Sequence, residues 1–126
     1  MKLLELLSGT CSIGQAAEAL GWEVISVDLE PKFAPTLCMS VLDIALDRWP
    51  EGTFQMIRCS PPCKNYSRAH SIGDRDLVGA DQLVTKTLEL IAALKPRFWF
   101  CENPQSGMLK DRPMLRQIRF HDVTYC

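Results

Sequence analysis

Apolar and polar positions follow one another along the chain in a pattern that predicts strands and helices in turn. Short apolar runs bounded by turn residues are typical of buried strands. Such runs occupy 3–7, 24–27, 36–41, 54–59 and 98–101, with a sixth candidate at 120–125. Helical spacing between them predicts helices over 12–20, 43–49 and 76–95, the first ended by Gly21 and the last by Pro96. This alternation predicts an α/β fold, a mostly parallel sheet with helices on both faces.

Three local patterns refine these elements. Ser12 and Gln15 have the spacing of a capping box, which predicts a helix start. The run at 98–101 is apolar on both faces, which favours a central strand. Apolar stripes at helical spacing predict the buried faces of the two longer helices. These stripes are Ile13, Ala16, Ala17 and Leu20, and Val84, Leu88, Ile91 and Ala92.

Length and composition bound the possibilities further. With 126 residues, 47% of them hydrophobic, and no repeat or linker, residues 1–126 are expected to form one domain. No apolar run approaches the roughly 18 to 20 residues of a membrane span. The apolar N-terminal run is interrupted by Glu5, so it does not have the about 7 to 15 apolar residues of a secretion signal. We therefore expect a cytoplasmic protein that does not bind membranes.

The six cysteines are then expected to be thiols. Only Cys59 and Cys63 lie close together in the sequence, and the paired spacing of a zinc site is absent. No metal site is expected. Charge is uneven: residues 1–55 carry three basic and eight acidic side chains, and residues 56–126 carry eleven basic and seven acidic ones. A basic second half suits a polyanion such as nucleic acid, although ordinary surface charge explains it equally well.

Ligands of parallel sheets bind beyond the carboxyl ends of the strands. After the first predicted strand, Ser8-Gly9-Thr10 forms a turn that opens onto a helix and presents free N–H groups. Asp28 ends the second strand, where a carboxylate can accept both hydroxyls of a ribose, and Asp43 follows the third, where it can hold an adenine amino group. Taken singly, each acid is equally well explained as a turn residue or helix cap.

The segment Ser60-Pro61-Pro62-Cys63 follows the fourth predicted strand. Two prolines stiffen the backbone and project the next side chain rigidly. With Lys64 adjacent and Arg58 and Arg68 nearby, Cys63 is a candidate nucleophile of lowered pKa. A buried small residue is the alternative.

Glu102-Asn103-Pro104 follows the fifth predicted strand directly. Apolar surroundings are expected to raise the pKa of Glu102, and a protonated carboxyl can donate a proton to a ring nitrogen. The alternative for a lone glutamate is a solvated loop acid. Adjacent parallel strands would bring Glu102 and Cys63 to the same end of the sheet.

The order of these motifs resembles the DNA (cytosine-5) methyltransferases, most closely the compact forms carried by phages and other viruses. The resemblance rests on Ser8-Gly9-Thr10, Asp28, Asp43, Pro61-Pro62-Cys63 and Glu102-Asn103-Pro104, and it covers essentially the whole chain. It implies a Rossmann-like methyltransferase fold, S-adenosylmethionine as cofactor and DNA, duplex or single-stranded, as partner. It also implies a bacterial or phage-infected host cell. By similarity, Cys63 would attack C6 of cytosine, and Glu102 would hydrogen-bond N3 and the amino group.

The resemblance also implies further binding residues. Those for the cofactor are Ser8, Gly9, Thr10, Cys11, Asp28, Leu29, Asp43 and Pro61. Those for the substrate are Pro62, Lys64, Ser67, Arg68, Asn103 and Pro104. Backbone phosphates would be contacted by Arg58, Lys64, Arg68 and Arg75.

Three departures from the family pattern qualify these expectations. Cys11 stands where glycine is usual, so its Cβ is expected to crowd the cofactor or change the backbone angle. Gln55 replaces a common acid, which is expected to weaken support for the loop that carries Cys63. The chain ends at 124–126, before the closing strand and the target-recognition region of the family, which predicts a homodimer or a partner chain on an open sheet edge.

The alternative functions are an inactive relative that binds cofactor or DNA as a decoy or regulatory subunit, and an enzyme for another acceptor such as tRNA cytosine.

Overall fold

The computed structural model describes residues 1–66, 76–103 and 107–116 of the chain. In these residues a five-stranded, all-parallel sheet has the strand order β3-β2-β1-β4-β5. The strands are β1 (Lys2–Leu6), β2 (Glu23–Asp28), β3 (Leu37–Cys38), β4 (Met56–Cys59) and β5 (Phe98–Cys101). The α-helices are α1 (Ser12–Ala19), α2 (Cys63–Tyr66), α3 (Leu77–Leu94) and α4 (Pro113–Arg116), and the 3-10 helices are η1 (Pro31–Phe33), η2 (Val41–Asp43) and η3 (Leu109–Asp111). The predicted α/β class with a parallel sheet is confirmed.

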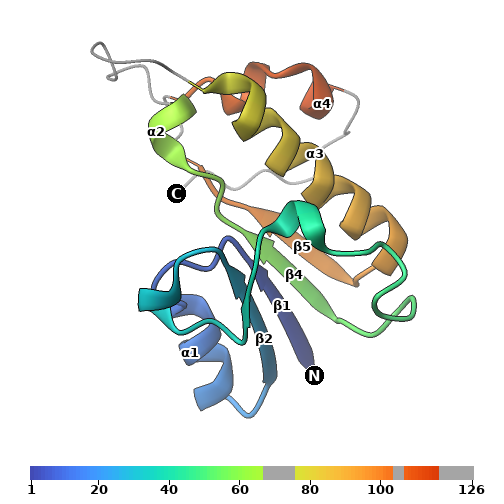
Figure 1. Cartoon of the computed structure of the whole chain (residues 1–126). Helices are drawn as coiled ribbons and strands as arrows, with labels where there is room; N and C mark the ends of the chain where they lie inside the picture. Colours follow the sequence, from blue (N-terminus) through green and yellow to red (C-terminus); the bar gives the residue numbers. More distant parts are fainter. Residues whose placement is uncertain (67–75, 104–106, 117–126) are drawn as a thin grey trace.

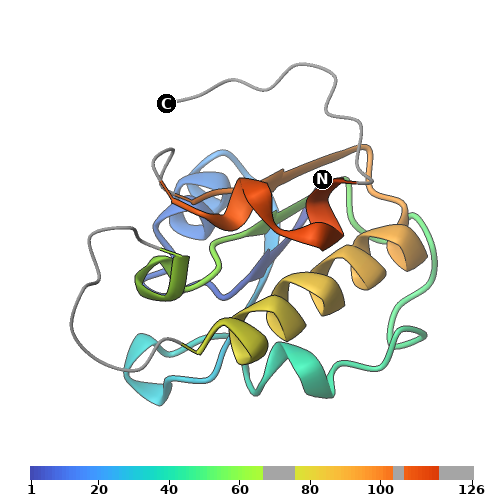
Figure 2. The same ribbon diagram turned by 90° about the horizontal axis from the view of Figure 1, so that it is seen from above.

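Helices cover the sheet from both sides. α1 lies on one face, over β1 and β2, and α3 lies on the other (Figures 1 and 2). Successive side chains of a strand point to opposite faces, so the central strand β1 serves both layers. Leu4 and Leu6 point towards α3, whereas Leu3 and Glu5 point towards α1.

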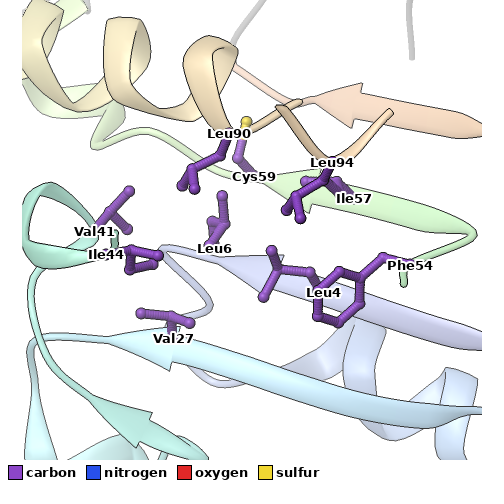
Figure 3. Packing of buried hydrophobic residues seen from close by; sticks show 10 residues of the cluster. All are labelled: Leu4, Leu6, Val27, Val41, Ile44, Phe54, Ile57, Cys59, Leu90 and Leu94. Carbon is purple, nitrogen blue, oxygen red and sulfur yellow. The ribbon is translucent and has the colours of Figure 1, made fainter. Parts of the chain in front are cut away.

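The main core lies between the sheet and α3. Leu4 and Leu6 of β1 are fully buried and belong to one cluster with Leu90 and Leu94 of α3 (Figure 3). Burying a leucine side chain contributes about 1.5 to 3 kcal/mol relative to leaving it exposed. A second cluster joins α2 and the first half of α3 to η3 and α4. Its buried members are Tyr66, Ala80, Val84, Leu109 and Leu115.

The start of α1 differs from the sequence prediction. Its N-cap is Cys11, and no side chain caps the helix in the manner of a capping box. Of the predicted buried stripe, Ala17 is buried, whereas Ile13 and Leu20 are 41% and 80% exposed. The helix packs through Ala17 and Gly14. A Cβ on Gly14 would lie 2.6 Å from Glu5 Oε2 and would also overlap Cys11 Sγ, so only glycine allows the helix this close to β1.

The longest helix is close to its prediction. Asp76 caps α3 by accepting a 2.7 Å hydrogen bond from the Gly79 N–H, and the helix ends at Lys95, which has a φ of +45°, before Pro96. Its buried face is turned slightly from the predicted one. Leu90 and Leu94 are fully buried, whereas Ala92 is exposed.

Several predicted elements are shorter or lie elsewhere. The third strand contains only two residues, and the helix predicted over 43–49 is not formed, since η2 ends at Asp43 and residues 44–49 contain no helix. β5 is an edge strand of the described sheet, not a central one, and Phe98 and Phe100 are 50% and 57% exposed. The strand predicted at 120–125 lies outside the described residues.

Candidate active site

Parallel strands bring their following segments to one edge of the sheet, and the predicted site residues lie along it. Ser8 to Cys11 follow β1, Asp28 and Leu29 close β2, and Asp43 lies in η2 after β3. Pro61 to Lys64 follow β4, and Glu102 and Asn103 follow β5. Four predicted residues lie outside the part of the chain that the structure describes: Ser67, Arg68, Arg75 and Pro104.

The loop after β1 is an open turn with an unusual backbone. Leu7, Gly9 and Cys11 have φ angles of +55°, +51° and +53°, which is the left-handed region that favours glycine. A Cβ built on Gly9 meets no atom within 4 Å, so the loop backbone faces open space there. The hydroxyl of Ser8 is buried and has no hydrogen-bond partner among the described residues. An accessible backbone beside an unsatisfied buried hydroxyl fits the binding of a polar ligand.

Asp28 holds this loop against the end of β2. Its Oδ2 accepts a hydrogen bond of 2.8 Å from Gly9 N, and its Oδ1 accepts one of 2.9 Å from Glu30 N. Each carboxylate oxygen has a second lone pair, so these bonds leave capacity for a ligand hydroxyl. Leu29 beside it is 66% exposed, and the side chain of Asp43 is also exposed.

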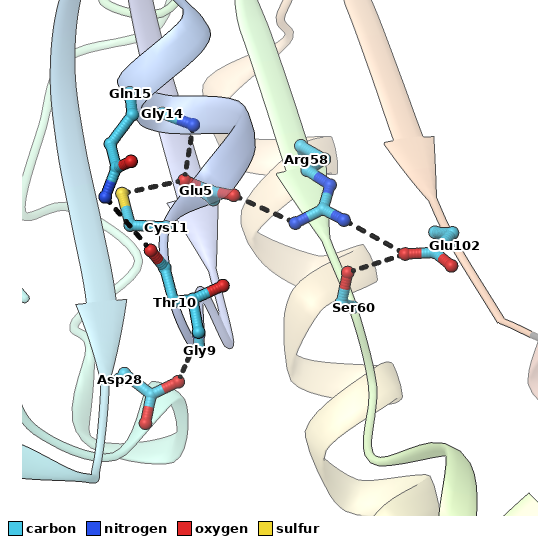
Figure 4. Close-up of polar contacts among 10 residues, drawn as sticks. All are labelled: Glu5, Gly9, Thr10, Cys11, Gly14, Gln15, Asp28, Arg58, Ser60 and Glu102. Carbon is cyan, nitrogen blue, oxygen red and sulfur yellow. Dashed lines mark hydrogen bonds and ion pairs between the residues drawn. The ribbon is translucent and has the colours of Figure 1, made fainter. Parts of the chain in front are cut away.

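Cys11 turns its side chain towards the interior. Its Sγ lies 3.0 Å from Oε2 of Glu5, and the thiol donates to this carboxylate (Figure 4). Burial and the hydrogen bond to Glu5 raise the pKa of Cys11 to about 11. The left-handed backbone costs a residue with a Cβ about 1 to 2 kcal/mol, so Cys11 is a strained substitute for glycine that keeps its thiol protonated at neutral pH.

Glu5 is a buried charge that the sequence pattern does not explain. It is 0% exposed, and it accepts hydrogen bonds of 2.9 Å from both Gly14 N and Arg58 Nη1. A buried carboxylate without partners would cost several kcal/mol, so Arg58 and the start of α1 compensate it. One glutamate therefore fixes both the helix after the β1 loop and a side chain of β4.

Arg58 joins two carboxylates. Its Nη2 donates a 3.0 Å hydrogen bond to Glu102 Oε2, while Nη1 pairs with Glu5 (Figure 4). Both terminal nitrogens of Arg58 are engaged by these two acids, which disfavours the predicted contact of Arg58 with a backbone phosphate. The expectation of apolar surroundings for Glu102 is wrong. Its side chain is 69% exposed, and Oε2 accepts a second hydrogen bond of 3.2 Å from Ser60 Oγ.

The segments after β4 and β5 are bonded to each other. Glu102 N donates to Cys59 O at 2.9 Å, and Asn103 Nδ2 donates to Pro61 O at 3.1 Å. Cys63 is exposed at the start of α2, two residues beyond Pro61. The predicted nucleophile and the predicted carboxyl group therefore stand on neighbouring loops whose relative position is fixed by hydrogen bonds.

Three residues that the sequence prediction missed anchor α2. Tyr66 is fully buried and donates a 3.0 Å hydrogen bond to Asp81 Oδ1 of α3. Arg112 donates through Nε to both oxygens of Asp81, at 3.1 and 3.0 Å, and pairs with it through Nη2. Burial and the Asp81 contact raise the pKa of Tyr66 strongly. Asp81 therefore joins the helix that carries Cys63 to the segment after β5.

Gln55, a predicted weakness of the site, lies just before β4, at the edge of the sheet opposite to the one that carries the predicted site residues. Its Oε1 accepts a 2.7 Å hydrogen bond from Lys2 N, and its backbone bonds to Lys2 and Phe98. These contacts tie together the amino ends of β1, β4 and β5. Among the described residues, none of these contacts reaches the loop of Cys63, so an effect of Gln55 on that loop stays a prediction.

The described residues also show the state of the cysteines and whether side chains gather for a metal ion. The five described cysteines, Cys11, Cys38, Cys59, Cys63 and Cys101, are free thiols. In the ranges 1–66, 76–103 and 107–116, no three His, Cys, Asp or Glu side chains gather as a metal ion requires, and no helix of these ranges is both long and apolar enough to span a membrane. A shallow depression of about 530 Å³ between η2 and α3 contains none of the predicted site residues.

Comparison with known proteins gives one informative relative. No family model matches the chain. The chain is 31% identical over 142 aligned residues to a "Probable DNA (cytosine-5)-methyltransferase" of Frog virus 3 (isolate Goorha). The alignment covers the whole chain and 63% of the relative, so the chain spans less than two thirds of that protein's length.

This relative is viral, as the motif resemblance suggests, but it gives no support to a phage origin. Neither the match nor the described contacts support the predicted homodimer, and the cellular compartment stays a prediction. The similarity extends over both motif-bearing loops and the strands before them. It therefore supports, for the whole chain, the resemblance to DNA (cytosine-5) methyltransferases.

Proposed function

We propose that the chain transfers a methyl group from S-adenosylmethionine to C5 of cytosine in DNA, through a covalent bond to Cys63. The observation that carries this proposal is the pair of hydrogen bonds between the two motif-bearing loops, Glu102 N to Cys59 O and Asn103 Nδ2 to Pro61 O. These bonds hold the Cys63 and Glu102 segments next to each other. The similarity to the Frog virus 3 protein supports the same reaction class.

The chemistry explains why a thiol and a carboxyl group are needed together. C5 of cytosine is a poor nucleophile. When the Cys63 thiolate forms a bond to C6, the electrons of the C5–C6 double bond become available at C5. Glu102 hydrogen-bonds N3 and the exocyclic amino group, which stabilises the charge that develops on the ring. After C5 has gained its methyl group, loss of the C5 proton expels the Cys63 thiolate and restores the double bond.

The edge formed by β1, β2 and β3 would hold the methyl donor. S-adenosylmethionine, when bound, supplies an electrophilic methyl group. The open backbone at Gly9 and the unsatisfied hydroxyl of Ser8 fit a polar ligand of this kind. Asp28 would accept hydrogen bonds from the ribose hydroxyls, and Asp43 would accept one from the adenine amino group. The remaining contacts are assigned to Thr10, Cys11, Leu29 and Pro61.

The acceptor base would lie over the loops of Cys63 and Glu102. Because C6 is inaccessible inside a duplex, the cytosine must be flipped out or presented in a single strand. Contacts to the base or to the adjacent DNA are assigned to Pro62, Lys64, Ser67, Arg68, Asn103 and Pro104. Lys64 is exposed, as a phosphate contact requires. Arg58 is left out of this group because two carboxylates engage it.

Methyl transfer to DNA tests the proposal. The chain is incubated with tritium-labelled S-adenosylmethionine and unmethylated DNA of mixed sequence, both duplex and single-stranded, and the DNA is digested to nucleosides. We expect labelled 5-methylcytosine from the wild type and from Cys38→Ser, which alters another exposed cysteine, and none from Cys63→Ser. Calorimetry with S-adenosylhomocysteine is the parallel measurement. Cofactor binding without transfer would support the non-catalytic alternative, and transfer to RNA alone would contradict DNA as the acceptor.

A further inference from the structure

Three charged side chains cross the sheet in one line. Glu5 lies on the central strand β1, Arg58 on β4, and Glu102 directly after β5 (Figure 4). The strand register explains the alignment, because Glu5 is the partner of Arg58, and Arg58 is the partner of Phe100. Glu102 follows Phe100 by two residues and so lies on the same face. The line therefore runs from the interior to the β5 edge of the described part of the sheet.

The inner end of this line is fixed. Glu5 is 0% exposed, and its Oε2 accepts from Gly14 N and Cys11 Sγ at 2.9 and 3.0 Å. Its Oε1 accepts from Arg58 Nη1 at 2.9 Å. The guanidinium is planar, so binding one terminal nitrogen to a buried anchor also sets the direction of the other. The Arg58 side chain is only 15% exposed, which further limits its motion.

The outer end would move freely without this support. The Glu102 side chain is 69% exposed, and a glutamate in solvent samples several rotamers. Arg58 Nη2 and Ser60 Oγ both donate to its Oε2, at 3.0 and 3.2 Å. Its Oε1 has no hydrogen-bond partner among the described residues. One carboxylate oxygen is therefore held while the other remains available.

We propose that Arg58 is a positioning residue that holds the Glu102 carboxylate ready for the acceptor base, with Glu5 as its buried anchor. Arg58 itself does not touch the base. Glu5 also bonds the loop after β1, so the same chain of hydrogen bonds joins the candidate cofactor loop to the candidate base-binding carboxylate. This inference rests on the proposed function, which gives Glu102 its task at the cytosine ring.

Arg58→Lys is the informative variant. A lysine keeps the positive charge that Glu5 needs for folding, but a single ammonium group does not reproduce the fork that reaches both carboxylates. Arg48→Lys, at an exposed arginine that lies over the half-buried ring of Trp49, is the matched control. We expect Arg58→Lys to lower kcat for methyl transfer by about 10- to 100-fold, since small misplacements of catalytic groups have effects of this size. The dissociation constant for S-adenosylhomocysteine should change less than about twofold in both variants.

A double-mutant cycle separates positioning from a structural role. If Arg58 acts through Glu102, Arg58→Lys should have no further effect on kcat when Glu102→Gln is already present. Effects that multiply would overturn the inference, as would an Arg58→Lys enzyme with the wild-type kcat. A kcat loss accompanied by weaker cofactor binding and lower thermal stability would indicate damage to the fold and would also overturn it.

A second readout does not depend on activity. In a chain labelled with ¹³C at glutamate side-chain carboxyls, Arg58→Lys should shift the Glu102 signal, whereas Arg48→Lys should leave it unchanged. If the wild type transfers no methyl group, the proposed function fails, and the Glu102 signal then decides whether Arg58 holds Glu102. An unshifted signal in Arg58→Lys overturns the inference whether or not the chain is an enzyme.

Discussion

The side-chain amide of Asn103 donates a hydrogen bond of 3.1 Å to the backbone oxygen of Pro61. This bond joins the segment after β5 to the proline-rich segment after β4, across 42 positions of sequence. The neighbouring bond from Glu102 N to Cys59 O extends the contact towards the strands. The separation of the two loops is therefore set by direct bonds between them and not only by the strands below.

Asn103→Asp should disrupt this contact. It replaces an amide donor with a carboxylate oxygen that repels the carbonyl of Pro61. We expect the free energy of unfolding to fall by about 1 to 3 kcal/mol, the usual cost of an unsatisfied buried polar group. Urea denaturation measures the loss. The same substitution at Asn65 is the control and should change stability by less than about 0.5 kcal/mol. Equal losses at both positions would contradict a specific role for the Asn103–Pro61 bond.

Cys11 should make the protein sensitive to alkaline pH. The folded thiol has a pKa of about 11, against an ordinary value of 9.0. Between these values the unfolded chain loses this proton while the folded chain keeps it, so rising pH favours unfolding. The stabilisation is complete below pH 9 and is lost as the pH rises to about 11. Its upper limit is about 3 kcal/mol, since the shift spans two pKa units of about 1.4 kcal/mol each, and solvent screening of the partly exposed thiol reduces it.

Cys11→Gly isolates this effect. Glycine accepts a φ of +53° without strain and has no group to titrate. The wild type should lose more stability between pH 9 and 11 than the variant does, while at pH 7 the relief of strain offsets the lost hydrogen bond to Glu5. Urea denaturation at a series of pH values tests this. Parallel pH curves for the two proteins would show that Cys11 does not titrate as described.

Tyr66 should matter for both stability and rate. Tyr66→Phe removes the hydroxyl that donates to Asp81, while Arg112 still compensates the carboxylate. We expect a loss of about 1 kcal/mol in unfolding free energy, and a lower methyl-transfer rate because Tyr66 ends the helix that begins at Cys63. Thermal denaturation and the transfer assay measure the two effects. A Tyr66→Phe protein more stable than the wild type would contradict the anchoring role.

The sequence predicted the elements that carry a strong local pattern. The limits of α3 follow from the cap Asp76 and the breaker Pro96, and β5 follows from its unbroken apolar run. The exposure of Ile13 and Leu20 in α1 was not predictable, because the packing of that helix is decided by Glu5 beneath Gly14. A local stripe contains no information about a residue on another element.

The same limit applies to the site. Cys63 and Glu102 could be proposed from their places after strands, since parallel strands share an edge. The link from Glu5 through Arg58 to Glu102 depends on the register of three strands that are far apart in sequence. A charged residue inside each of two apolar strands was the available signal. Opposite charges on neighbouring strands favour a cross-strand ion pair, so Glu5 and Arg58 together indicate such a pair once their strands are known to be neighbours.

The covalent step proposed for Cys63 can be measured directly with DNA that contains 5-fluorocytosine. Fluorine at C5 cannot leave as the proton does, so a base that has bonded to the thiolate and gained its methyl group remains attached to the protein. With S-adenosylmethionine present, the account predicts a DNA–protein adduct that survives denaturation, maps to the peptide containing Cys63, and is lost in Cys63→Ser but not in Cys38→Ser. A chain that binds S-adenosylhomocysteine yet forms no adduct, or an adduct at another cysteine, would contradict it.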